Sequence, residues 1–198
     1  MLFGEELMSA FAALSPNSLA GTGYRVINLR YADSPLSGAG ALKHGGRFNY
    51  GAIYHPGQEF EALYVAEGLM TALTEADIVV RGATGYDEGV PSIPRVIFSI
   101  EYRLSAVIDL TEDSVRDSLT LTPNELETHW LRLNGEGKAA PTQVLGYIAY
   151  QQGNISGLRY PSFKDPDFCN LVIFDRHVPG DYLWIFQRPE SNNPGLAP

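Results

Sequence analysis

Apolar and polar residues alternate in several short segments of the chain, a pattern that predicts β-strands. A clear example is YRVINLRY, residues 24–31, which combines alternation with β-branched and aromatic side chains. The same criteria predict strands over residues 62–66, 95–104, 106–111, 158–162, 170–175 and 181–188. Sheet structure is therefore expected to form much of the core.

Other segments carry apolar residues at helical spacing. Residues 2–14 place their large apolar side chains roughly on one helical face. In EGLMTALTEADIVV, residues 67–80, the apolar residues Leu69, Leu73 and Ala76 recur with the helical period. Two helices, one at each of these segments, are therefore predicted.

Two more helices are predicted from the residues that begin and end them. TPNELETHWLRL begins with Thr122 as the N-cap and Pro123 in the first turn. PTQVLGYIAYQQG, residues 141–153, begins with Pro141 and is closed by Gly153. Because helices and strands are interleaved irregularly, we expect an α+β fold around a mixed, curved sheet, with helices on its flanks.

The remaining segments are rich in glycine, proline and small polar residues. Residues 55–60 and 82–94 have the composition of loops, and residues 191–198 are expected to form a disordered tail. A length of 198 residues is sufficient for one domain, 1–198, with a substantial core.

Composition restricts the classes of function. The net charge of −9 argues against binding to nucleic acid, which requires a basic face. Cys169 is the single cysteine, so no intramolecular disulfide can form and a cytoplasmic location is expected. No apolar run is long enough to cross a bilayer, and Glu5 and Glu6 interrupt the N-terminal apolar run, which argues against a signal peptide.

One segment has the opposite charge to the whole chain. GAGALKHGGRFN, residues 38–49, contains cationic side chains and no acidic residue. Gly45 and Gly46 leave backbone N–H groups accessible, and Arg47 can hold phosphate or carboxylate through paired hydrogen bonds. The segment is thus either an anion-binding loop or a plain turn with a solvated arginine.

Motifs of common catalytic sites are missing. The histidines have no HExxH spacing and no cysteine at metal-ligand distance, so a metal site is not expected; they are His44, His55, His129 and His177. The chain also has no GxSxG, GxGxxG or P-loop pattern, which argues against the hydrolase, Rossmann and Walker sites that carry them.

Several polar residues in or near predicted strands and helices remain. Arg25 lies among apolar neighbours and needs either an anionic partner or access to water. Glu75 is either a solvated helix residue or a site carboxylate, and Tyr64 is either a core or a site tyrosine. Ser162 follows a proline that restricts the backbone, which suits either an oriented hydroxyl or an ordinary turn.

Taken in order, these segments resemble the RES domain. The matching stretches are YRV, LSGAGALKHGGRFN, ALYVAEGLMTALTE, GLRYPS and NLVIF, which together run from about residue 22 to 188. The resemblance implies a fold similar to that of ADP-ribosyltransferases and an activity that destroys NAD+. It also implies the toxin of a bacterial toxin–antitoxin pair with an Xre-like antitoxin as its protein partner.

By matching motif, the resemblance implies that one group of residues binds the cofactor-like substrate NAD+. Arg25 and Arg47 would hold its pyrophosphate, together with Gly45, Gly46 and Asn49 of the same glycine-rich motif.

A second group would act near the scissile bond. Tyr64 would pack against nicotinamide and ribose, Glu75 would be the key carboxylate, Ser162 would complete the site, and Asn170 would shape it. Nicotinamide leaves as a neutral molecule from a cationic ring, so the carboxylate would stabilise positive charge on the ribose and no metal is required.

Three functions remain open at this point. The first is NAD+ cleavage with water or phosphate as acceptor, the second is protein ADP-ribosylation, and the third is a non-catalytic partner-binding module. The segments around 50–60 and 82–94 look longer than the usual family connectors and could reshape the acceptor side. The presence of Arg47, Tyr64 and Glu75 favours an enzyme.

Overall fold

The computed structural model describes residues 1–82, 87–90, 93–165, 167–174 and 178–186. Most strands belong to one six-stranded sheet of order β1-β2-β7-β6-β5-β8, and β1 also pairs with β5. The strands are β1 (Asn17–Asn28), β2 (Ala62–Ala66), β5 (Arg95–Asp109), β6 (Gly157–Pro161), β7 (Cys169–Phe174) and β8 (Tyr182–Ile185).

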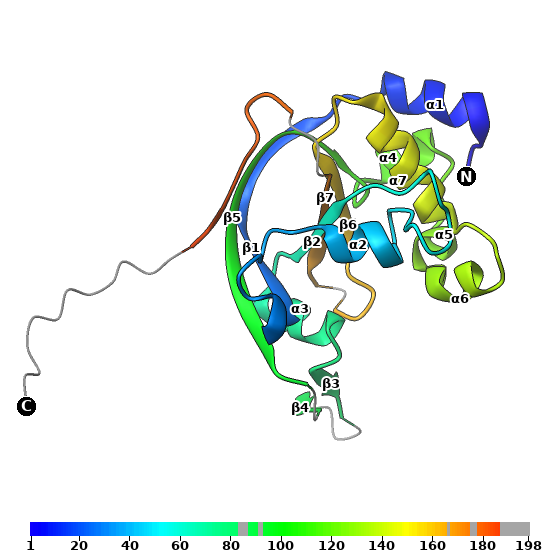
Figure 1. Ribbon diagram of the computed structural model, residues 1–198. Helices are drawn as coiled ribbons and strands as arrows, with labels where there is room; N and C mark the ends of the chain where they lie inside the picture. Colours follow the sequence, from blue (N-terminus) through cyan, green and yellow to red (C-terminus); the bar gives the residue numbers. More distant parts are fainter. Residues whose placement is uncertain (83–86, 91–92, 166, 175–177, 187–198) are drawn as a thin grey trace, which may run out of the picture.

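The sheet is mixed and strongly curved. β5 and β6 run parallel, whereas the other pairs in this sheet are antiparallel. The long strands β1 and β5 bend together into a wall, and the pairing of β1 with both β2 and β5 makes the sheet nearly close on itself (Figure 1). The expected α+β fold with a curved, mixed sheet is confirmed.

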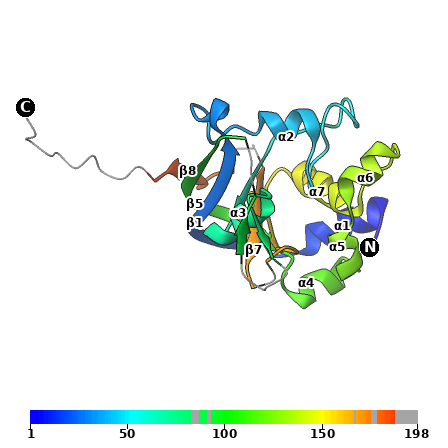
Figure 2. The ribbon, with the colours of Figure 1, turned by 90° about the horizontal axis from the view of Figure 1, so that it is seen from below.

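Helices flank the sheet on the side away from the β1–β5 wall. Figure 2 shows this helical group opposite β1, β5 and β8, with α2 and α3 nearer the wall. The helices are α1 (Gly4–Ala13), α2 (Ala39–His44), α3 (Leu69–Glu75), α4 (Asp113–Ser118), α5 (Pro123–Glu127), α6 (Trp130–Gly135) and α7 (Pro141–Gln152).

Two apolar clusters stabilise this arrangement, and β2 contributes to both. Leu63 and Val65 point to one face of β2 and pack inside the curved sheet with Leu104 and Leu171. Ala62, on the opposite face, packs under the helices together with residues of α1, α7 and β6. A central strand that is apolar on both faces fixes the sheet between two cores, so the residues at its ends are held rigidly.

Several boundaries differ from the sequence prediction. β1 begins at Asn17 rather than near residue 24, because pairing with β5 extends the strand through the small residues before Tyr24. The strands predicted over 95–104 and 106–111 are one continuous strand, β5. The helix predicted from Thr122 begins with that residue as N-cap, as expected, and Glu125 completes a capping box. It divides into α5 and α6 at extended backbone around Thr128.

The helix predicted over 67–80 is much shorter than expected. α3 ends at Glu75, and Asp77 reverses the chain with a φ of 54°. A small hairpin of β3 (Val79–Arg81) and β4 (Asp87–Gly89) follows where continuing helix and loop were predicted. This early end places Glu75 at the last turn of its helix.

Other differences and agreements concern the helices. α2 occupies part of the segment predicted as a glycine-rich loop, and α4 was not predicted. α7 begins at Pro141 and is capped by Gly153, as predicted. The predicted tail, 191–198, lies outside the described residues.

Candidate active site

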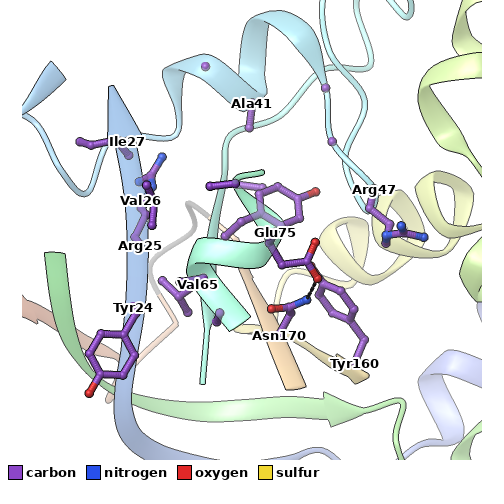
Figure 3. A pocket seen from close by; sticks show the side chains of 18 of the residues that line it. Tyr24, Arg25, Val26, Ile27, Ala41, Arg47, Val65, Glu75, Tyr160 and Asn170 are labelled. Carbon is purple, nitrogen blue, oxygen red and sulfur yellow. Dashed lines mark hydrogen bonds between the residues drawn. The ribbon is translucent and has the colours of Figure 1, made fainter. Parts of the chain in front are cut away.

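A cavity of about 480 Å³ opens where β1, α2, β2 and α3 converge (Figure 3). It gathers most of the site residues predicted from the sequence, although they come from widely separated segments. Those that line it are Arg25, Gly45, Gly46, Arg47, Tyr64, Glu75 and Asn170. Ser162 and Asn49 are placed behind this lining, and each bonds to a residue in it.

Glu75 is held from one side by two neutral donors. Ser162 Oγ donates to Glu75 Oε1 at 2.8 Å, and Asn170 Nδ2 donates to the same oxygen at 2.7 Å. Oε2 accepts no hydrogen bond from the described residues. The carboxylate is therefore oriented by one oxygen while the other is available to a ligand (Figure 3).

Ser162 acts through Glu75 rather than from the cavity wall. Its hydroxyl is buried, and Oγ also accepts the backbone N–H of Asp165 at 3.1 Å, which directs its O–H toward Glu75. It lines a second cavity of about 400 Å³ together with Phe163 and Leu126. Its contacts indicate a positioning residue.

Tyr64 presents its ring to the cavity while its hydroxyl is anchored behind it. The hydroxyl donates to Asn49 Oδ1 at 2.9 Å and accepts the backbone N–H of Phe48, also at 2.9 Å. Burial raises the pKa of Tyr64 above its ordinary value, so the phenol stays neutral at physiological pH. Gly46 packs so closely here that a Cβ would lie 2.6 Å from Tyr64 Oη.

Asn49 is fully buried and does not line the cavity. Its side-chain amide donates to the carbonyls of Ala41, Tyr50 and Phe60 at 2.9 to 3.1 Å. Its side-chain oxygen accepts from Tyr64, so both the amide group and the oxygen of Asn49 already have partners within the protein. A role in NAD+ binding, if Asn49 has one, therefore passes through Tyr64 and the surrounding loop.

The two cavity arginines have carbonyl partners and no acidic partner among the described residues. Arg25 donates from Nη1 to Pro35 O at 2.8 Å and from Nη2 to Ser37 O at 3.0 Å. Arg47 donates from Nη1 to Leu126 O at 2.5 Å. Burial lowers the pKa of Arg25 to about 10, which leaves it charged at neutral pH.

Arg159 shows how a structural arginine of this fold is neutralised. It forms ion pairs with Glu67 at 2.6 Å and with Asp109 at 2.9 Å. In contrast, Glu75 is the one carboxylate among the described residues that line the cavity, and no ion pair joins it to either arginine. A partly buried cation without an acidic partner is costly, so Arg25 and Arg47 suit an anionic ligand.

Three further residues of this region were not predicted. Gln143 is fully buried in α7 and donates from Nε2 to Gly46 O at 3.1 Å and Asn49 O at 3.3 Å, so it holds the turn that carries Arg47. Tyr160 and Trp130 line the cavity. The signal that could have identified Gln143 is a glutamine on the same helical face as the apolar residues of α7.

Tyr160 lies beside the carboxylate. Its ring centroid is 4.5 Å from that of Phe48, and its hydroxyl makes no hydrogen bond to the described residues. Burial, with the nearby charge of Glu75, raises the pKa of Tyr160 well above its ordinary value. The tyrosine therefore remains a neutral donor or acceptor beside the site.

Neither metal ligands nor a membrane span emerge from the described part of the chain. It contains no group of three or more histidine, cysteine, aspartate or glutamate side chains placed to hold a metal ion. Its helices include none with the length and apolar character needed to cross a bilayer.

Comparison with known proteins identifies the family. The family model of the RES domain matches residues 22–189 of the chain. The chain belongs to the RES domain family. The match includes every lining residue discussed above, from Arg25 to Asn170, and confirms the resemblance seen in the sequence motifs.

Two individual proteins are similar to the chain. A curated protein named Toxin Res, from Yersinia enterocolitica serotype O:8 / biotype 1B (strain NCTC 13174 / 8081), is 27% identical over 154 residues. That alignment covers 78% of this chain and 84% of the relative. A solved structure, the MbcT–MbcA toxin–antitoxin complex of M. tuberculosis, matches with a TM-score of 0.65. This alignment covers 93% of this chain and 91% of the other at 22% identity, and shows that the two chains share a fold.

Proposed function

We propose that this RES-domain chain cleaves the bond between nicotinamide and ribose in NAD+, as the toxin of a bacterial toxin–antitoxin pair. The observation that carries the proposal is the combination of Glu75, held through one oxygen by Ser162 and Asn170, with two arginines that have no acidic partner in the described part of the chain. Two cations suit a ligand that contains a diphosphate. A carboxylate between them suits a bond whose cleavage leaves positive charge on the ligand.

The chemistry requires little beyond these groups. Nicotinamide departs from a ring that already carries positive charge, so no general acid has to protonate it. As the bond lengthens, positive charge develops on the ribose, as in glycoside cleavage. The free oxygen of Glu75 can stabilise that charge, and the fixed oxygen keeps the carboxylate from having to reorient during the reaction.

The arginines would hold the substrate through its pyrophosphate. A guanidinium has more N–H donors than the contacts of Arg25 and Arg47 with backbone carbonyls use. The tethering carbonyls restrict each side chain before substrate arrives, which reduces the entropy lost on binding. Tyr64 would contribute a flat apolar surface for nicotinamide and the ribose.

Three activities are possible, and they differ in the group that accepts the ribosyl moiety after nicotinamide leaves. Water gives a glycohydrolase, inorganic phosphate a phosphorylase, and a protein side chain an ADP-ribosyltransferase. Incubating the purified chain with NAD+, with and without phosphate, and identifying the products distinguishes the first two. Labelled NAD+ in a bacterial lysate tests for the third, and a folded protein that releases no nicotinamide in any of these assays would contradict cleavage.

The toxin role is supported by the names of the relatives, Toxin Res and a toxin–antitoxin complex. The expected partner is an Xre-like antitoxin, and the expected place of action is the cytoplasm, where NAD+ is available. Expression of the chain alone in bacteria should stop growth and lower cellular NAD+, and co-expression with the neighbouring antitoxin should restore both. Normal growth with soluble wild-type protein would contradict the toxin role.

A further inference from the structure

Trp130 is a large aromatic residue that makes few stabilising contacts with the described part of the protein. It opens α6, is partly exposed and lines the cavity. It belongs to neither apolar cluster, and within the described residues its ring makes no aromatic pair and its indole N–H no hydrogen bond. A buried indole N–H usually finds a hydrogen-bond partner, and aromatic rings gain from stacking, so a ligand can supply the contacts that the fold does not.

The segment that carries Trp130 is attached to Arg47. The Arg47 guanidinium donates to the carbonyls of Leu126 and Thr128, which end α5 just before Trp130. The ring of His129 accepts the N–H of Arg132 and caps the start of α6. Arg47 and Trp130 therefore belong to one rigid corner of the cavity.

The position of Glu75 determines which part of a dinucleotide can reach that corner. Glu75 lies between Arg25 and Arg47 in the close view (Figure 3). With the scissile bond at Glu75 and the pyrophosphate held by both arginines, as proposed above, the second base extends past one of the two arginines. Toward Arg25 the neighbouring groups are carbonyls of a loop, and the ring of Tyr24 points away from Glu75 (Figure 3). Toward Arg47 the neighbouring lining residue is aromatic.

We propose that Trp130 is a positioning residue that stacks on the adenine of NAD+, with Arg47 holding the adjacent phosphate. This inference rests on the proposed function, since it places nicotinamide at Glu75. The indole offers a flat apolar surface for a purine, and such stacking changes affinity by roughly tenfold when the aromatic ring is removed. The chain then recognises the whole dinucleotide rather than the reacting half alone.

Kinetics with two substrates test the proposal. Nicotinamide mononucleotide contains the scissile bond but lacks the adenosine, so it cannot use Trp130. Trp130→Ala should raise the KM for NAD+ about tenfold with little change in kcat, leave the KM for the mononucleotide within twofold, and be largely rescued by Trp130→Phe. Trp184→Phe, on the distant strand β8, is the matched control and should change neither constant.

Fluorescence supplies a readout that does not depend on turnover. The chain has two tryptophans, so a Trp184→Phe, Glu75→Gln protein carries Trp130 as its single indole. NAD+ and ADP should both quench it, and nicotinamide mononucleotide should not. Quenching by the mononucleotide but not by ADP, or an unchanged KM for NAD+ in Trp130→Ala, would overturn the assignment.

Failure of the inference and failure of the proposed function are distinguishable. If wild-type protein cleaves NAD+ and Trp130→Ala has the same KM for NAD+, the proposed function stands and the proposed role of Trp130 is wrong. If wild-type protein cleaves nothing, the function is wrong. In that case the ADP titration still decides whether Trp130 faces an adenine nucleotide.

Discussion

At the scale of single residues, the site depends on how a few polar atoms are shared. One oxygen of Glu75 accepts hydrogen bonds from Ser162 and Asn170, and the other accepts none from the described residues. No carboxylate in the described part of the chain pairs with Arg25 or Arg47. The structure thus separates the fixed oxygen of Glu75 from the free one.

Glu75→Gln should abolish most of the activity without unfolding the protein. The amide is nearly isosteric but has no charge to stabilise the developing cation, so the rate of nicotinamide release should fall by about 10²–10³. Thermal unfolding should occur near the wild-type temperature, because Glu75 is only partly buried and the amide can still accept from Ser162. A folded Glu75→Gln protein with wild-type turnover would place the key carboxylate elsewhere.

Arg25→Lys should make activity sensitive to rising pH. Burial lowers the pKa of Arg25 to about 10, and the guanidinium still keeps its proton through neutral pH. A lysine in the same surroundings begins from a lower ordinary pKa, which burial also lowers, so it loses its proton and its hold on phosphate as pH rises.

The corresponding measurement is the KM for NAD+ between pH 6 and 9. The lysine variant should show a KM that increases with pH, whereas the wild-type value should vary much less. Arg47→Lys is the companion variant. It should raise the KM at every pH because it also loses the tether to Leu126. If both variants match wild type, the arginines do not bind phosphate.

At the scale of secondary-structure elements, the turn that carries Arg47 is held against α7. Gln143 donates to carbonyls on both sides of Arg47, and Gly146 lets the helix approach the backbone of Phe48 closely. A helix far along the chain therefore positions the glycine-rich motif.

Gly146→Ala should destabilise the protein and displace this turn. The added Cβ would overlap the carbonyl oxygen of Phe48, which is backbone and cannot rotate away. We expect a loss of about 1–3 kcal/mol in the free energy of unfolding and a weaker affinity for NAD+. Gly135→Ala in α6 is the matched control, since its Cβ would meet nothing within 4 Å and its stability should be equal or higher. Equal unfolding curves for the two variants would contradict the close contact.

At the scale of the whole molecule, the core extends beyond the segment that matches the family. α1 lies before residue 22, yet Leu7 and Phe11 are buried in the same cluster as α7 and β6. Because these side chains do not line the cavity, stability and catalysis should be separable here.

Phe11→Ala should lower stability by about 3–5 kcal/mol, the usual cost of removing a buried phenylalanine, while kcat and KM measured well below the unfolding temperature stay near wild type. Met8→Ala, at an exposed position of the same helix, is the control and should unfold within about 0.5 kcal/mol of wild type. A large kcat change in folded Phe11→Ala protein would show that α1 reaches the site.

Local patterns were sufficient for part of this architecture. β2, α7 and the N-cap at Thr122 agree with prediction because each depends on residues adjacent in sequence. The glycine-rich motif around Arg47 suited either an anion-binding loop or a plain turn, and anion binding there stays a prediction.

Tertiary structure decided what local patterns left open. The end of α3 at Glu75, the continuity of β5 and the break between α5 and α6 depend on contacts with distant segments, which a local pattern does not contain. Taken alone, Glu75 was consistent with an ordinary solvated helix residue, and its own segment did not single it out as a site carboxylate. Only the approach of Ser162, which directly follows β6, and of Asn170 in β7 gave it a fixed orientation, because hydrogen bonds across some ninety residues of sequence require the folded sheet.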